Sequence, residues 1–446
     1  MLRRRLLLSS TAAAWATGAW TVWPGLSTAL ASAPLRSEGG PARKLVVVML
    51  RGAVDGLSVV VPHGDAGYRQ SRGSIALPAP GTSDGAVLPL DSLFGLHPAL
   101  ARLMPLWQTG HLGFVHASGS PDPTRSHFDA QDYMETGTPG RKSTPDGWMN
   151  RLLAQLPGPA APTRAVNMGP TPPRILAGGA AVANLGVGPR ALESKAIDNP
   201  ELQAALGRLY GREGELARTL QETRDSRSEM SRSMAMAEAR SRQSRLDAQM
   251  NAGAAADNGR SSDPSADAGA PTARGFAADA LRLGQLIQAD PHTQLAFTSV
   301  GGWDTHVNQG GARGALANRL GSLGEGLESL VQGLGDAFEH TVIVVMSEFG
   351  RTVRQNGTGG TDHGRGNVMW MLGGPVAGGQ VRGAWPGLER SALVDGRDLA
   401  VTTDFRAVLS PILQQHLGLS DHGLAQVFPG FAGTSLHSPV GTLLKS

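Results

Sequence analysis

The chain has 446 residues, a net charge of +3 and no cysteine. The absence of cysteine excludes disulfide bonds, thiolate zinc sites and cysteine nucleophiles, so a metal site would have to use histidine and carboxylate ligands. The charge is small, and no basic block is interleaved with aromatic residues, which argues against a nucleic-acid partner.

The N-terminus has the pattern of an export signal. Arg3, Arg4 and Arg5 precede an apolar stretch, and the small residues at 29–33 fit a cleavage site. Paired arginines are typical of the twin-arginine route, although no Ser or Thr precedes them here. We therefore expect residues 1–33 to be a signal peptide, the twin-arginine machinery to be a partner, and the mature protein to be periplasmic or extracellular. The alternative is a membrane anchor, but polar residues and proline interrupt the stretch.

The first predicted strand covers residues 44–50, a continuous apolar run typical of a strand that is buried on both faces. A glycine-flanked turn that contains Asp55 follows it. Residues 97–108 have the pattern of an amphipathic helix, and residues 112–117 that of the next strand. The first strand therefore delivers a carboxylate to its C-terminal end.

A polar loop before a short helical pattern at 130–135 holds Arg125, Ser126 and His127. Ser126 is the candidate nucleophile, because a bound metal could activate its hydroxyl. The alternative is that Ser126 caps the helix, with Asp129 completing a capping-box pattern. His127 is a candidate metal ligand or acid/base, and Arg125 could bind an anion.

Residues 200–272 differ in composition from the rest of the chain. Mixed charges at helical spacing predict a long exposed helix, and the small polar residues at 251–271 predict a disordered linker. We interpret this stretch as an insertion into one domain that covers residues 42–446. The alternative is a helix that docks an envelope protein.

Beyond the insertion, helical and strand patterns alternate. Helices are expected at 276–288 and 315–338, and strands at 294–300, 341–346 and 367–372. This alternation predicts an α/β/α sandwich around a mostly parallel, doubly wound sheet.

Charged residues collect at the ends of these strands. Carboxyl ends of parallel strands meet at one rim of the sheet, where such proteins build their sites. Carboxylate oxygens and imidazole nitrogens are suitable ligands for divalent cations. One such pair alone would more simply be a capped turn, but several strand ends favour a site for one or two ions (Zn, Mn, Mg or Ca). The predicted ligands are Asp55, Asp304, His306, Glu348, Asp362 and His363.

A similar pair, Asp421 and His422, follows a helix-like run at 409–417 and no strand. We interpret this Asp as a turn or cap residue.

Together these motifs resemble a bacterial family, domain of unknown function 1501, which is grouped with alkaline phosphatases and sulfatases. The resemblance rests on residues 51–57, 126–137, 302–306, 347–352 and 362–364. It implies an α/β/α sandwich with a di-metal centre and a serine or threonine nucleophile, in proteins exported by the twin-arginine route.

The resemblance also implies roles for individual residues. Ser126 matches the nucleophile, and Arg125 or Arg351 would steady the anion. Phe349 departs from the superfamily pattern, which usually has a histidine ligand there, so a full two-zinc site is not expected. The remaining matches are metal ligands: Asp55, Asp304, His306, Glu348 and His363.

The resulting hypothesis is an exported, metal-dependent hydrolase of phosphate or sulfate esters or a related anionic substrate. The alternative is a non-catalytic binding or assembly protein of the envelope that keeps the fold.

Overall fold

The computed structural model describes residues 42–158, 161–188, 199–210, scattered positions between 221 and 235, 265–431 and 441–445. The expected signal peptide and much of the expected insertion lie outside these residues. No helix in the described ranges is both long and apolar enough to cross a bilayer.

A nine-stranded sheet with the order β11-β5-β10-β9-β1-β8-β6-β7, in which β12 also pairs with β5, forms the centre of the fold. Apolar side chains fill both of its faces, so the strands read as continuous hydrophobic runs. The strands are β1 (Lys44–Leu50), β5 (Leu112–Gly119), β6 (Ala165–Met168), β7 (Ala183–Leu185), β8 (Leu295–Val300), β9 (Thr341–Ser347), β10 (Asn367–Leu372), β11 (Val381–Arg382) and β12 (Thr403–Asp404).

The sheet is mixed, because β10 runs antiparallel to both of its neighbours, β9 and β5. The pairs β1–β8, β1–β9, β6–β8 and β6–β7 are parallel. The reversal has a consequence for the site: residues that precede β10 lie at the same rim as residues that follow β9 and β1.

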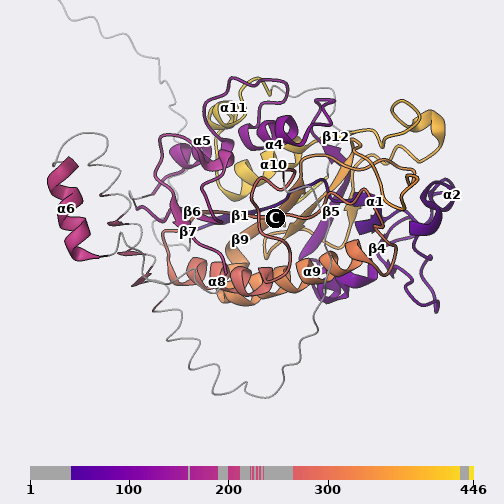
Figure 1. The fold of residues 1–446 in the computed structure, drawn as a ribbon, viewed down its shortest axis with the longest axis horizontal. Coiled ribbons are helices and arrows are strands. Elements are labelled where there is room, and N and C mark those ends of the chain that lie inside the picture. The colour runs from indigo at the N-terminus through magenta and orange to yellow at the C-terminus, as the bar shows by residue number, and fades with distance from the viewer. Residues whose placement is uncertain are drawn as a thin grey trace, which may run out of the picture. The chain divides into compact units, whose positions relative to one another are not determined.

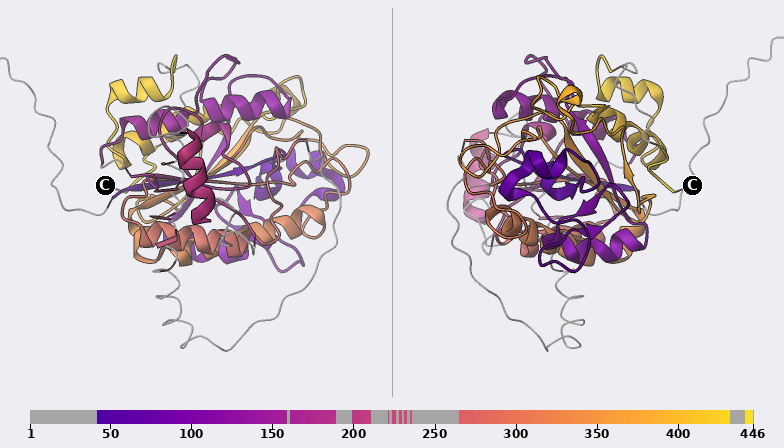
Figure 2. Two further views of the ribbon diagram at one scale, coloured as in Figure 1. Left: turned by 60° about the vertical axis from the view of Figure 1, so that its left-hand side comes forward. Right: turned by 90° about the vertical axis from the view of Figure 1, so that its right-hand side faces the viewer.

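Helices cover both faces of the sheet in the expected three-layer arrangement (Figure 1). Alternate residues of β1 point to opposite sides. Val46 and Val48 join the core beneath α8 (Phe276–Ala289) and α9 (Ala315–Leu334), whereas Leu45 and Val47 join the core on the other face. In the left view of Figure 2, α8 and α9 again lie along one side of the sheet. The second face is covered by α5 (Trp148–Gln155), α10 (Phe405–Pro411) and α11 (Asp421–Val427).

Shorter elements complete the domain. A three-stranded sheet contains β2 (Val60–Val61), β4 (Gly95–Leu96) and β3 (Leu88–Pro89). The other helices are α1 (Gly56–Val59), α2 (Tyr68–Arg72), α3 (Met104–Gln108), α4 (His127–Thr136) and α6 (Pro200–Tyr210). Short 3₁₀ turns are η1 (Gly73–Ile75), η2 (Pro98–Leu103), η3 (Arg174–Leu176), η5 (Gly335–His340) and η6 (Arg390–Ala392), and η7 (Ile412–His416) is a π-helical turn.

Two helices are interrupted where the sequence predicts continuity. The expected helix at 97–108 is the 3₁₀ turn η2 followed by α3, and Pro105 stands in the first turn of α3. The expected helix at 315–338 ends at Leu334, and Gly335, which takes a positive φ of 48°, begins the 3₁₀ turn η5. A residue with positive φ ends a helix because it cannot continue the ladder of hydrogen bonds.

The far end of the expected insertion packs into the fold. Ala266 is 1% exposed and Asp267 is 7% exposed. Thr272 forms a bridge with Gly301 directly after β8. The stretch from 265 onward therefore belongs structurally to the rim of the sheet.

Candidate metal centre

A tight turn after β8 presents Asp304 and His306. Trp303 is fully buried in the core, and its indole N–H donates to the Val300 carbonyl at 2.8 Å, which anchors the turn. The Gly302 amide donates to Asp267 Oδ1 at 2.6 Å. From the end of β1, Gly52 approaches the turn so closely that a Cβ there would lie 2.7 Å from the Asp304 nitrogen. The position of Asp304 is therefore fixed from two sides.

A short antiparallel ladder beyond β9 and before β10 presents His363. Gly364 donates to the Gly350 carbonyl and Gly350 to the Arg365 carbonyl, both at 2.8 Å. Arg351 and His363 pair in an isolated bridge. A Cβ on Gly350 would lie 1.9 Å from the Gly366 oxygen, so only glycine allows the two segments to approach this closely.

The first turn of α4 presents His127. Ser126 caps this helix, and its hydroxyl accepts from the Asp129 amide at 3.5 Å. His127 is 9% exposed and Phe128, the next residue, is 67% exposed.

These three segments bring four ligand atoms together, and we call His127, Asp304, His306 and His363 the His/Asp cluster. His363 Nε2 lies 3.0 Å from the Nε2 atoms of both His127 and His306. Asp304 Oδ1 lies 3.0 Å from His306 Nε2, 3.2 Å from His363 Nε2 and 3.7 Å from His127 Nε2. His127, Asp304 and His363 together form a group that could hold a metal ion.

Each histidine of the cluster uses its other ring nitrogen to donate to an oxygen. His127 Nδ1 donates to Glu348 Oε1 at 2.8 Å, and His306 Nδ1 donates to Asp362 Oδ1 at 3.0 Å. His363 Nδ1 donates to the Arg125 carbonyl at 2.9 Å. An acceptor of this kind fixes the ring and its tautomer in many metal sites.

These bonds decide what the ring nitrogens at the centre can do. Carboxylates and carbonyls only accept, so each Nδ1 carries a proton, and a ring that holds no second proton turns an Nε2 lone pair inward. Three lone pairs and a carboxylate oxygen therefore face one another at close range. Only positive charge makes this arrangement favourable, and the donor set suits a divalent cation with mixed nitrogen and oxygen ligands.

The pKa shifts in the cluster also indicate that positive charge is favourable at its centre. Burial lowers the pKa of His127, but hydrogen bonds to Asp304 and Glu348 outweigh it and raise the pKa to about 9. Burial raises the pKa of Asp304, yet bonds from His127 and His363 and the charge of Arg351 bring it far below its usual value. In the absence of a metal, a proton on His127 would supply part of the missing positive charge.

Glu348 and Asp362, which the sequence predicts as metal ligands, lie one layer further out. Glu348 is fully buried, and its Oε1 also accepts from the Gly52 amide at 2.8 Å and from Gln131 Nε2 at 2.9 Å. Asp362 Oδ1 also accepts from Asn356 Nδ2 at 3.1 Å. Both carboxylates hold histidines in place.

Asp55 is not brought into the cluster. Its buried Oδ2 accepts from Arg72, from Ser58 Oγ at 2.8 Å and from Gln309 Nε2 at 2.6 Å. Arg72 has no exposed side-chain surface, so the ion pair compensates two buried charges. The carboxylate at the end of β1 thus has a structural partner of its own.

The other predicted residues surround the cluster. Arg351 is buried and donates to Asp304 Oδ1 at 2.6 Å and to Thr361. Arg125 pairs with Asp398, so both arginines already have anionic partners. The exposed Ser126 makes no hydrogen bond to the cluster among the described residues. The Phe349 ring packs on His127 and His363, with centroids 4.9 and 5.2 Å away.

Sequence reasoning missed the role of Gln131. Its amide links Glu348 to Arg51, whose guanidinium donates to Gln131 Oε1 at 2.6 Å. Gln131 also donates to the Ala266 carbonyl at 2.7 Å. The available signal was its spacing four residues after His127, which puts both side chains on one face of α4.

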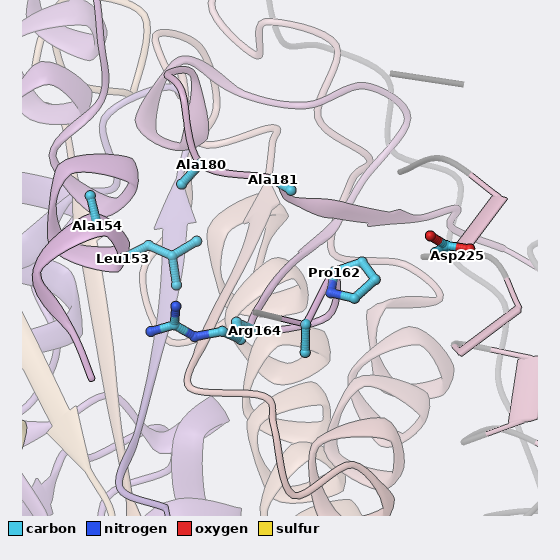
Figure 3. A pocket seen from close by; sticks show the side chains of 8 residues that line it. Leu153, Ala154, Pro162, Arg164, Ala180, Ala181 and Asp225 are labelled. Atoms are coloured by element: carbon cyan, nitrogen blue, oxygen red, sulfur yellow. The ribbon is translucent and has the colours of Figure 1, made fainter. Parts of the chain in front are cut away.

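Several pockets lie among the described residues. One of about 320 Å³ adjoins α4 and includes Gln131 and Arg51 in its lining. Another of about 430 Å³ is lined mainly by small and apolar residues with Arg164 and Asp225, and contains no residue of the His/Asp cluster (Figure 3).

Residues 106–428 match the family described as protein of unknown function (DUF1501). The chain belongs to this family. The matched region includes His127, Asp304, His306 and His363, so the whole His/Asp cluster lies inside the DUF1501 region. No curated protein sequence matches the chain significantly.

Solved structures offer more distant likenesses. Ps i-CgsB in complex with k-i-k-neocarrahexaose has a TM-score of 0.39 at 11% identity, with 86% of this chain and 74% of that chain covered. The C-terminal periplasmic domain of EcEptC from Escherichia coli has a TM-score of 0.34 at 11% identity, with 89% of each chain covered. Its zinc complex has a TM-score of 0.30 at 11% identity, with coverage of 75% and 73%. Because these scores are low, we draw no functional conclusion from them.

Proposed function

We propose that this protein is an exported, metal-dependent hydrolase of phosphate or sulfate esters, within the alkaline-phosphatase-like superfamily. The observation that carries the proposal is the convergence of three Nε2 atoms and Asp304 Oδ1, while each Nδ1 lies within hydrogen-bond distance of an oxygen. His127, Asp304, His306 and His363 would hold the cation. A divalent cation bound there would supply Lewis acidity for attack on an ester.

The overall reaction adds water to the ester. A water oxygen bonds to phosphorus or sulfur, the bond from that atom to the alcohol oxygen breaks, and the alcohol leaves with one proton of the water. Glu348 is a poor candidate for the base because its two oxygens accept from the protein. Its role is to hold the His127 ring, whereas Arg351 balances the charge of Asp304.

The sequence predicts Ser126 as the nucleophile, in a route where a covalent ester forms first and water then hydrolyses it. The Ser126 hydroxyl caps α4, so replacement by alanine should cost about 1 kcal/mol of stability. We expect Ser126→Ala to keep hydrolysis, because water attack does not need this hydroxyl. Loss of hydrolysis with unchanged stability would instead identify Ser126 as the nucleophile.

The decisive experiment is elemental analysis of natively loaded protein, together with hydrolysis of 4-nitrophenyl phosphate and 4-nitrophenyl sulfate. We expect about one divalent ion per chain. His306→Ala should lose both the ion and hydrolysis; the exposed His422→Ala is the control and should keep both. A protein without a bound ion would overturn the proposal. A bound ion without hydrolysis of any ester would favour the non-catalytic binding protein.

A further inference from the structure

The pocket of about 320 Å³ beside α4 is linked to the His/Asp cluster by hydrogen bonds, although no cluster residue lines it. We call it the proline-lined pocket because Pro170, Pro172 and Pro173 form part of its wall. Gln131 lines it and donates to Glu348, which in turn holds His127. Phe128, which also lines it, directly follows His127 in α4. Two hydrogen bonds, through Gln131 and Glu348, therefore connect the pocket lining to His127.

The cations that line this pocket are already paired. Arg51 contacts Glu135 Oε1 at 2.7 Å and donates to Gln131, and both partners are buried. Arg174 contacts Asp132 Oδ1 at 3.3 Å and donates to the Pro145 carbonyl at 2.9 Å. Because each arginine is balanced by a carboxylate of the same pocket, the lining offers a polyanion no net positive charge.

The pocket instead offers apolar surface to a ligand. Phe128 is 67% exposed, the largest exposed fraction of any large hydrophobic side chain among the described residues. Phe297 and the three prolines also line the pocket. Among the described residues, only Leu202 and Val307 are comparably exposed large hydrophobics.

We propose that the proline-lined pocket binds a neutral, partly apolar group of the substrate, such as the aromatic or alkyl part of the alcohol released from the ester. This inference rests on the proposed function for its link to an ester. The anionic part of the substrate stays at the His/Asp cluster, and the neutral part lies along Phe128.

Binding of 2-naphthol, a neutral aromatic alcohol, tests the pocket without turnover. Equilibrium dialysis with naphthol fluorescence should detect binding to the full-length, metal-loaded protein. Phe128→Ala should weaken it roughly two- to tenfold, the range expected for loss of one aromatic contact. Thr171→Trp, which fills the pocket from an exposed position, should abolish binding.

Val307→Ala is the matched control. Val307 is 50% exposed and directly follows a cluster histidine, as Phe128 does, but it does not line this pocket. It should leave naphthol binding unchanged, and all three variants should keep the metal content of the natural protein. With 2-naphthyl phosphate as substrate, Phe128→Ala should raise KM and leave kcat unchanged, whereas glycerol 3-phosphate should show no change in KM.

The possible results separate the two proposals. Naphthol binding that is unaffected by Phe128→Ala and Thr171→Trp would overturn the pocket assignment, and so would competition by ATP for the same site. Naphthol binding as expected, but without ester hydrolysis, would retain the pocket and remove the hydrolase function.

Discussion

At the scale of single residues, the candidate centre depends on which atom of a side chain faces inward. Glu348 stands at a strand end where a ligand is expected, but its oxygens accept from Gly52, Gln131 and His127. His127 thereby becomes the inward-facing group. Sequence spacing locates both residues at the rim, but only the hydrogen bonds decide which one can bind a cation.

Glu348→Gln tests this arrangement with little change of shape. The amide oxygen can take the three bonds of Oε1, and the new N–H₂ group can donate to Ser347 Oγ, which lies 2.9 Å from Oε2. The His127 ring then loses a charged acceptor. We expect metal affinity to fall about 10- to 100-fold with the fold intact, as measured by metal titration.

The exposed Glu339→Gln provides a control with the same loss of charge. It should leave metal affinity unchanged. Equal affinities in both variants would mean that Glu348 does not support the metal site.

At the scale of secondary structure elements, the direction of β10 explains why His363 reaches the cluster. A parallel strand would carry its preceding residues to the opposite rim, whereas the antiparallel β10 starts beside the ends of β1 and β9. The apolar run at 367–372 predicts this strand with correct bounds. Its direction depends on pairing with β5 and β9, which are distant in sequence, and is therefore not readable from local pattern.

Two buried histidines should make the fold sensitive to acid. His97 Nδ1 accepts from the Ala99 amide at 3.1 Å at the start of η2, and its Nε2 donates to the Gly311 carbonyl at 3.2 Å. His116 is held in the same way by Ala117 and Val60. Burial lowers the pKa of each to about 4.

Because these pKa values are lowered, the unfolded chain binds protons more readily than the folded protein between about pH 6.5 and 4. The contribution of these neutral histidines to the free energy of unfolding is fully present above pH 6.5. It is lost as the pH drops through this window, by on the order of 3 kcal/mol per histidine. Urea unfolding across this range measures the effect. His97→Asn, whose side-chain oxygen can still cap η2, should reduce the slope of unfolding free energy against pH by about one proton.

The exposed His422→Asn should leave this slope unchanged. His422 lies in α11, where the Ser420 hydroxyl accepts from the Gly423 amide at 3.1 Å. Ser420 is therefore the cap, and Asp421, which the sequence suggests as a turn or cap residue, is the first residue of the helix. An unchanged slope for His97→Asn would show that His97 titrates alike in the folded and unfolded chain.

At the scale of the whole molecule, the sequence predicts the α/β layers and the rim of the sheet that carries the candidate site. It does not predict which short strands and loops complete that rim. The strands at 44–50 and 367–372 match their predicted bounds because their apolar runs are unbroken. Strands β6 and β7 were not predicted, since four and three residues give little periodicity. Asp55 was predicted as a ligand because it follows the first strand. Its actual partner, Arg72, lies 17 residues away in α2, and no local pattern marks that pairing.

The segment at 265–271 is another case in which local sequence does not reveal tertiary contacts. Its small polar composition resembles a linker, yet it contacts the site through two bonds. The Ala266 carbonyl accepts from Gln131 at 2.7 Å, and Asp267 Oδ1 accepts from the Gly302 amide at 2.6 Å. It also supplies Ala268, Gly269 and Ala270 to the proline-lined pocket. Composition alone could not distinguish this wall from the residues that precede it.

Two replacements that keep the chain length test whether residues 265–271 contribute to the site and residues 247–264 do not. Exchanging residues 247–264 for a Gly/Ser sequence should leave stability and metal affinity as they are, since the composition of this stretch is already that of a linker. Exchanging residues 247–271 removes the Asp267 carboxylate and the buried Ala266 side chain, so the Gly302 amide loses its acceptor. Its cost should be on the order of 3 kcal/mol in urea unfolding, with weaker metal binding and no naphthol binding. Equal behaviour of the two variants would show that the wall contributes nothing to the turn of Asp304.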